Sequence, residues 1–400
     1  MTPSPRPNPP WREPLTRRRL LQRGGSAALG LSALSYWAAC GTTGGPAALD
    51  AVQQVRKGPI ADDMYFANWP LYIDVDEETG ERGTLVRFQR KYGVKTKYVE
   101  EINDNTEFFG KVRQQYAQGD SGGRDIHVVT DWMAAKMKRL GYVQKLDPEA
   151  LPNVKANLID RLTAPPFDPK REFSVPWQTG QTGIIYRKDK VKRTPKSVND
   201  LFDPDYKGKV TMLTEMRDTV GLVMLGMGLN PEKDGVDAAL KAIDKIGEAS
   251  DSGQIRGFTG NEYTKDISRG DSWVIIGWSG DAVQLIADNP NIEFLQPDEG
   301  FMLWTDNMQI PVGAPHAYTA EVFMNYVYDP EVQADITEYV NYVCPVKGVQ
   351  EIIEKRDPEL ASSQLVFPDE ETFARAYIFR DTSSAEELVL DEAFQKVLGA

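Results

Sequence analysis

The chain has 400 residues, of which 41% are hydrophobic and 26% are charged, values typical of a globular protein rather than a disordered one. Its net charge of −13 disfavours nucleic acid and anionic lipid as partners and favours a cationic partner. Only His127, His316, Cys40 and Cys344 are available as histidine or cysteine ligands, and their spacing matches no metal site, so we expect neither a metal nor another cofactor.

The first 40 residues have the order of an export signal. Thr16 precedes three arginines and two leucines, an arrangement typical of twin-arginine signals, and an uncharged stretch at 24–39 follows. This stretch is shorter than the ~20 residues that span a bilayer as a helix. The small residues before Cys40 resemble a lipidation site, although Trp37 stands where leucine is usual. We therefore expect residues 1–40 to direct export and Cys40 to carry lipid; an uncleaved membrane anchor is the alternative.

A flexible tether is predicted next, over residues 41–61, because its residues are small and polar. From there on, short apolar runs alternate with segments of helical periodicity. In the first part, Asn105 and Thr106 are expected to cap a helix, and Gly141 is expected to end another. The predicted order is strand 64–67, helix 84–92, strand 94–99, helix 105–116, strand 125–129 and helix 131–140.

The same alternation resumes in the second half of the chain. Strands are predicted at 210–213, 273–276 and 292–295, and helices at 218–228, 235–249, from 281, at 319–328 and at 331–342. A last helix is expected to begin at Ser384, with Glu387 completing a capping box. Alternating strands and helices of these lengths predict an α/β fold, and a chain of this size predicts two lobes.

Tryptophans and carboxylates gather in the segments expected to follow strands, where α/β sheets bind ligands. These segments are 68–72, 130–132, 214–218, 278–281 and 304–306. Four of them contain a tryptophan, and all but the first contain a carboxylate. Aromatic faces and carboxylates together suit an extended organic cation, since each ammonium gains ~0.5–2 kcal/mol from a nearby ring. The structural alternative is that the tryptophans are core residues and the acids are helix caps.

Several motifs make the chain resemble the polyamine-binding proteins of the spermidine/putrescine type that serve ABC importers. They are Tyr65-Phe66-Ala67-Asn68-Trp69, Pro166-Phe167-Asp168-Pro169 with Phe173-Ser174-Val175-Pro176, Tyr206-Lys207-Gly208-Lys209, and Phe301-Met302-Leu303-Trp304-Thr305-Asp306. The resemblance extends from residue 62 to 400. It implies the type II periplasmic-binding-protein fold, with two α/β lobes and a ligand cleft between them.

The resemblance also implies how the lobes divide and what they do. Residues 62–177 and 307–349 form lobe 1, and residues 178–306 and 350–400 form lobe 2. The lobes close on spermidine or putrescine and deliver it to an ABC transporter permease, without enzymatic chemistry. The protein is expected to be a monomer in the periplasm or on the outer face of the cytoplasmic membrane, anchored by lipid at Cys40.

Ligand contacts are carried over from the family to individual positions of this chain. Trp278 and Trp304 match the two tryptophans that sandwich the alkyl chain, and Asp306 matches a carboxylate that binds an ammonium. Leu71 stands where relatives place a glutamate, and Asp131 or Asp281 is expected to compensate for the missing carboxylate. The full set is Trp69, Thr130, Asp131, Trp132, Glu215, Asp218, Trp278, Asp281, Trp304, Asp306 and Tyr342.

Three other interpretations remain open at this point. The same fold binds thiamine, other organic cations or amino-acid derivatives, and thiamine suits the tryptophans nearly as well. The segment Gly119-Asp120-Ser121-Gly122-Gly123 has the pattern of a serine-protease nucleophile, but both histidines follow it in the sequence, unlike in that family. A lipid-anchored adhesin is supported by Cys40 alone.

Overall fold

The computed structural model describes residues 54–399 except Glu77 and Asn261. The predicted export signal, Cys40 and most of the predicted tether lie outside these residues. No helix in the described part of the chain is both long and apolar enough to cross a membrane.

Ten strands form one continuous mixed sheet in the order β2-β1-β3-β9-β4-β7-β5-β6, with β10 beside β9 and β8 beside β4. The strands are β1 Asp63–Asn68, β2 Lys95–Glu100, β3 Ile126–Thr130, β4 Val175–Arg187, β5 Val210–Leu213, β6 Ile255–Thr259, β7 Val274–Trp278, β8 Ile292–Leu295, β9 Phe301–Gln309 and β10 Ala376–Tyr377.

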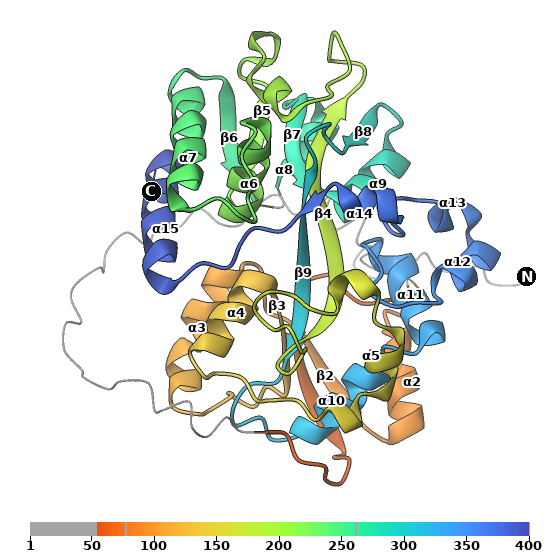
Figure 1. Ribbon diagram of the computed structural model, residues 1–400. Coiled ribbons are helices and arrows are strands. Elements are labelled where there is room, and N and C mark those ends of the chain that lie inside the picture. The colour runs from red at the N-terminus through yellow and green to blue at the C-terminus, as the bar shows by residue number, and fades with distance from the viewer. Residues whose placement is uncertain (1–53, 77, 261, 400) are drawn as a thin grey trace, which may run out of the picture.

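Helices cover this sheet in both the upper and the lower half of the molecule, so the predicted α/β class is confirmed (Figure 1). The helices are α2 Gly83–Tyr92, α3 Asn105–Ala117, α4 Asp131–Arg139, α5 Pro152–Asn157, α6 Met216–Gly226, α7 Val236–Asp251, α8 Tyr263–Arg269, α9 Ser279–Asp288, α10 Ala317–Tyr326, α11 Pro330–Val340, α12 Gln350–Arg356, α13 Pro358–Ala361, α14 Glu370–Ala374 and α15 Ser384–Leu398.

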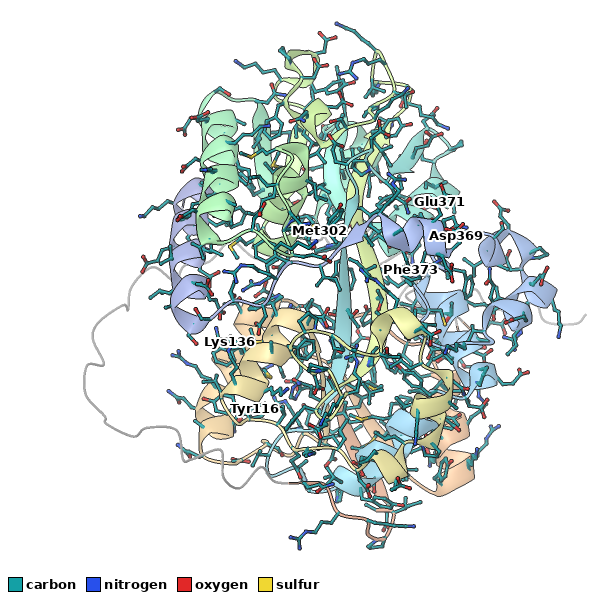
Figure 2. The ribbon with its side chains drawn as sticks, viewed as in Figure 1. Tyr116, Lys136, Met302, Asp369, Glu371 and Phe373 are labelled. Atoms are coloured by element: carbon teal, nitrogen blue, oxygen red, sulfur yellow. The ribbon has the colours of Figure 1, made fainter. Side chains whose placement is uncertain are left out.

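Two long antiparallel strands, β4 and β9, run through the whole molecule and join its two lobes (Figure 1). One end of β9 pairs with β3 in the first lobe, from Asp306 to Gln309. Its other end pairs with β10 in the second lobe, at Phe301 and Met302. Figure 2 accordingly places Met302 in the upper lobe and Tyr116 of α3 in the lower one. The middle of both strands therefore lies where the lobes meet.

Each lobe has its own apolar core. In the first lobe, Phe66 packs edge-on against Trp177 and Phe323, with ring centroids 5.4 and 5.2 Å apart. In the second lobe, Ile276 of β7 and Val220 of α6 belong to a separate buried cluster. Separate cores allow the lobes to move as units about the strands that connect them.

Besides β4 and β9, a third segment of the chain connects the lobes, and its position differs from the expected one. Ile353 of α12 and Ala361 of α13 belong to the same core cluster as Phe66, so these helices pack on the first lobe. The sequence-based boundary at residue 350 assigned them to the second lobe. We therefore propose that the chain passes to the second lobe between α13 and β10.

Local signals at two helix starts were misplaced by one residue. The cap of α3 is Asp104, whose carboxylate accepts from the amides of Thr106 and Glu107, rather than Asn105 or Thr106. The capping box of α15 consists of Ser383 and Glu386, rather than Ser384 and Glu387. In both cases neighbouring residues that also favour the cap position offered an equally good sequence pattern.

The sequence predicted a loop at a strand end for residues 304–306, but the structure contains no such loop there. They lie in the middle of β9, because this strand continues from one lobe into the other. Polar residues interrupt its apolar pattern where it crosses the junction, and this interruption is what resembled a loop. These positions lie in the part of β9 where the two lobes meet.

Candidate functional site

An unbroken series of aromatic rings runs through the junction between the lobes. Trp278 contacts Trp304 with ring centroids 6.5 Å apart, and Trp304 contacts Tyr342 at 5.4 Å. Tyr342 in turn meets Tyr72 edge-on at 5.8 Å. The rings come from β7, β9 and two loops, so the series exists only because the junction brings these elements together.

The backbone is shaped to let two of these rings lie close to it. A Cβ on Gly180 of β4 would stand 2.1 Å from the Trp304 ring. A Cβ on Gly280 of α9 would stand 2.5 Å from the Tyr342 ring. Real Cβ atoms do not approach other atoms this closely, so glycine at both positions is required for the observed ring packing.

Asp306 lies at the first-lobe end of this series and is buried. Its carboxylate accepts hydrogen bonds from the Thr130 hydroxyl at 2.7 Å and the Tyr72 hydroxyl at 2.9 Å. The pKa of Asp306 is raised to about 7, mainly by burial and also by the nearby charges of Asp131 and Asp218, while these hydrogen bonds oppose the shift. It forms no ion pair with any described residue. The ionised carboxylate is therefore held by neutral donors only.

Asp218 lies at the other end of the series, in the first turn of α6. Its carboxylate accepts from the Trp278 indole nitrogen at 2.8 Å. Burial raises the pKa of Asp218 to about 6, against the opposing effects of hydrogen bonds from Trp278 and Thr182 and of the Arg217 charge. Two buried carboxylates therefore stand at the two ends of one aromatic series.

Trp132 and Glu215 meet around a buried guanidinium. The Arg217 guanidinium lies 3.8 Å from the centre of the Trp132 ring and 4.0 Å from a Glu215 oxygen. Burial raises the pKa of Glu215 to about 8, and the neighbouring Asp218 charge contributes to this rise. The positive charge next to Trp132 is therefore supplied by the protein itself.

Asp131 and Asp281, the expected substitutes for a carboxylate at position 71, both bond to the protein. Asp131 accepts from the Thr305 amide at 3.1 Å and the Asn307 side chain at 2.8 Å, which fastens α4 to β9. Asp281 accepts from the Tyr263 hydroxyl at 2.6 Å. These contacts assign both carboxylates at least a positioning role.

Trp69 stands beside the site rather than in the ring series. Its indole nitrogen donates to the Val128 carbonyl at 3.1 Å, and its partly buried ring packs against the first-lobe cores. Leu71, two residues later, has a φ of 57°, a conformation that non-glycine residues rarely adopt. This turn places the Tyr72 hydroxyl within hydrogen-bonding distance of Asp306.

Several residues that hold the site were missed by sequence reasoning. Thr182 accepts from the Trp304 indole nitrogen at 3.1 Å, and the Tyr263 hydroxyl accepts from the Trp278 amide at 3.1 Å. Asn105 donates to the Thr130 hydroxyl at 2.9 Å. Tyr72 belongs to a loop that the sequence did single out, whereas nothing local marks Thr182 or Tyr263, because their roles arise from strand pairing and helix packing.

A cavity of about 1150 Å³ lies elsewhere, lined by residues such as Val55, Gln144 and His316. Its lining includes none of the predicted site residues. The described residues also contain no group of three or more His, Cys, Asp or Glu side chains that is placed to hold a metal ion. The junction remains the candidate site.

Known proteins resemble this chain over most of its length. The spermidine/putrescine-binding periplasmic protein of Escherichia coli is 25% identical over 346 residues, which cover 84% of this chain and 92% of that protein. The putrescine-binding periplasmic protein PotF of the same organism is 27% identical, with 87% and 95% covered. The crystal structure of PotD from Streptococcus pneumoniae superposes with a TM-score of 0.71 at 24% identity, covering 84% of this chain and 98% of that one.

The fold predicted from the family resemblance is thus confirmed, since the structural neighbours are PotD-type periplasmic binding proteins. Residues 84–365 match the family described as bacterial extracellular solute-binding protein. That family consists of transport proteins rather than enzymes and acts outside the cytoplasm. The chain therefore belongs to the bacterial extracellular solute-binding proteins.

Proposed function

We propose that this protein captures a polyamine, spermidine or putrescine, between its two lobes. The observation that carries the proposal is the pair of buried carboxylates, Asp306 and Asp218, at opposite ends of one aromatic series. Neither forms an ion pair with a described residue. The names of the curated relatives support the same ligand class.

The geometry explains how a diammonium ligand would be held. Its methylene chain would lie along the indole faces of Trp278 and Trp304, and each ammonium near a ring would gain ~0.5–2 kcal/mol. Each charged end would complete the hydrogen bonding of one carboxylate, a charge-assisted bond about twice as strong as a neutral one. Binding would also remove the free-energy cost of a buried charge that has no counter-ion, so the ligand would stabilise the closed arrangement of the lobes.

Closure would use the two strands that cross the junction. Asp306 and Trp304 belong to β9 itself, whereas Asp218 and Trp278 belong to the second lobe. A ligand bound to both sets would hold the lobes together and favour the closed state in proportion to its differential affinity. The closed form would then deliver the ligand to an ABC transporter permease, with the protein acting as a monomer tethered by lipid at Cys40 and performing no chemistry.

A serine hydrolase is not supported by the geometry around Ser121. The Ser121 hydroxyl is buried and has no hydrogen-bond partner in the described structure. His127 instead lies against Tyr116 and Gln309, and the His316 ring lies near Asp125. A nucleophilic serine needs a histidine base within hydrogen-bonding reach, so Ser121 lacks the required activation.

Calorimetric titration of residues 41–400 with putrescine, spermidine and thiamine tests the ligand class. Butylamine is the matched control ligand, because it has the methylene chain of putrescine but only one ammonium. We expect saturable one-to-one binding of a polyamine and at least about tenfold weaker binding of butylamine, from the loss of one charged hydrogen bond. Tighter binding of thiamine, or equal binding of butylamine and putrescine, would refute the assignment of two end carboxylates.

The anchor is tested separately. Cys40→Ser in the full chain should move the protein from the membrane fraction to the soluble periplasmic fraction after export. An unchanged membrane association of this variant would contradict lipidation at Cys40 and favour an uncleaved anchor.

A further inference from the structure

Helices α4 and α15 belong to different lobes. Met133 and Met137 of α4 are buried in an apolar cluster of the first lobe. Leu390 and Phe394 of α15 are buried in the core of the second lobe. Each helix is thus fixed to its own lobe by its apolar face, and Figure 1 shows the start of α15 reaching down toward α4.

The contact between these two helices is made by charged side chains. The Lys136 ammonium lies 2.8 Å from a Glu387 oxygen. Arg139 bridges Asp381 at 2.9 Å and the second Glu387 oxygen at 3.4 Å. Figure 2 shows Lys136 on α4, near the level at which the two lobes meet. All of these pairs join the first lobe to the second.

This charged contact continues directly into the candidate site. Trp132, Lys136 and Arg139 are spaced by four and three residues, so they share one face of α4. Trp132 stacks on Arg217, and the Arg217 guanidinium is also 4.0 Å from Glu387. One helix face therefore carries both a predicted ligand-binding tryptophan and the ion pairs to α15.

Glu387 is the centre of this contact. Its side chain is only 6% exposed, whereas those of Lys136 and Arg139 are 27% and 33% exposed. Glu387 belongs to the second lobe but is covered in part by cations of the first. Separating the lobes would return it to water together with Lys136 and Arg139, so the contact can break without exposing apolar surface.

We propose that the ion pairs of Lys136 and Arg139 with Glu387 and Asp381 form a polar clasp that sets the equilibrium between the closed and open lobes. Glu387 is its main positioning residue and acts on ligand affinity through closure, without touching the ligand. A clasp that favours the closed state raises affinity, because a ligand binds in proportion to the fraction of protein that is competent to hold it. Its effect on ligand binding rests on the proposed function, whereas its effect on lobe closure does not.

The test compares Glu387→Gln with Glu392→Gln. Both variants lose one carboxylate from α15, but Glu392 is exposed and forms no ion pair with any residue that the structure describes. We expect Glu387→Gln to weaken putrescine binding about tenfold, within the usual range of conformational coupling, mainly through faster dissociation. In small-angle X-ray scattering without ligand, its radius of gyration should exceed that of the wild type. Glu392→Gln should match the wild type in both measurements.

Measurements at high salt and a double-mutant cycle distinguish loss of the clasp from a general loss of structure. Raising the salt to about 1 M screens charges beyond ~3 Å, so it should open the wild type more than Glu387→Gln. Lys136→Met and Glu387→Gln should be non-additive in dissociation constant. Additive effects, or the same scattering and affinity for Glu387→Gln and Glu392→Gln, would overturn the clasp. If the wild type binds no polyamine, scattering still decides the clasp, and only the proposed function fails.

Discussion

Carboxylates in two regions of the junction between the lobes have opposite kinds of partner. In the clasp, Glu387 is satisfied by Lys136 and Arg139 from the other lobe. At the two ends of the aromatic series, Asp306 and Asp218 accept hydrogen bonds from hydroxyl and indole groups and form no ion pair with a described residue, and burial raises the pKa of each.

This difference separates the charges that we propose to hold the lobes together from those that we propose to bind the ligand. A buried carboxylate without a cation is destabilising, and proteins tolerate such groups mainly where they have a function. A carboxylate with protein cations around it is already neutralised and offers little to an incoming ammonium. The following predictions test this comparison, beginning with the largest expected effect.

Asp306→Asn should weaken putrescine binding at least about 100-fold, because an ammonium buried beside the amide would lack its counter-charge. The melting temperature without ligand should stay the same or rise at pH 7.5, since the variant removes a destabilising buried charge. Titration calorimetry and thermal melting check these two results. Unchanged affinity would show that Asp306 is not a ligand carboxylate, and a collapse of the melting temperature would assign it a structural role.

Gly180→Ala should weaken binding by about tenfold, because its Cβ would displace the Trp304 ring from the series and with it part of the ring's contact with the ligand. Tryptophan fluorescence should shift, and the response to salt that we expect of the clasp should be retained. The matched control is Gly257→Ala in β6, where a Cβ meets no atom within 4 Å. Similar affinities of the two variants would indicate that the position of Trp304 does not matter for the ligand.

Affinity should rise by about tenfold between pH 6 and pH 8 from the ionisation of Asp306, and by about a further twofold from that of Asp218. The free protein holds Asp306 with a pKa of about 7, and a bound ammonium favours the ionised form, so binding releases protons below that pH. The ligand amines stay protonated over this range, since alkyl ammonium groups titrate near 10. Calorimetry in two buffers of different ionisation enthalpy measures the released protons directly.

The clasp variant Glu387→Gln should retain this slope with pH, because the slope originates mainly at Asp306, with a smaller part from Asp218. Affinity that is constant from pH 6 to pH 8, with no proton release, would contradict an ionisation of Asp306 on binding. A slope that disappears in Glu387→Gln would place the titrating group in the clasp instead.

Much of this molecule was predictable from local pattern. The alternation of short apolar runs with helical periodicity predicted the α/β class, and strands such as 210–213 and 292–295 have the predicted bounds. These features depend on neighbours in sequence, so they are visible there. The tryptophans and carboxylates were also recognisable as a set, because they recur close to the ends of predicted strands.

Tertiary structure decided what local pattern does not encode. The placement of residues 304–306 inside β9 depends on a strand that serves two cores, and the aromatic series depends on rings from four separate segments. The pairing of Lys136 with Glu387 joins residues 251 positions apart. Sequence alone thus determined which side chains are present and which elements they form. Only the packing of two lobes decided which carboxylates form ion pairs across the junction and which form none with a described residue, because burial and charge pairing are properties of the assembled junction.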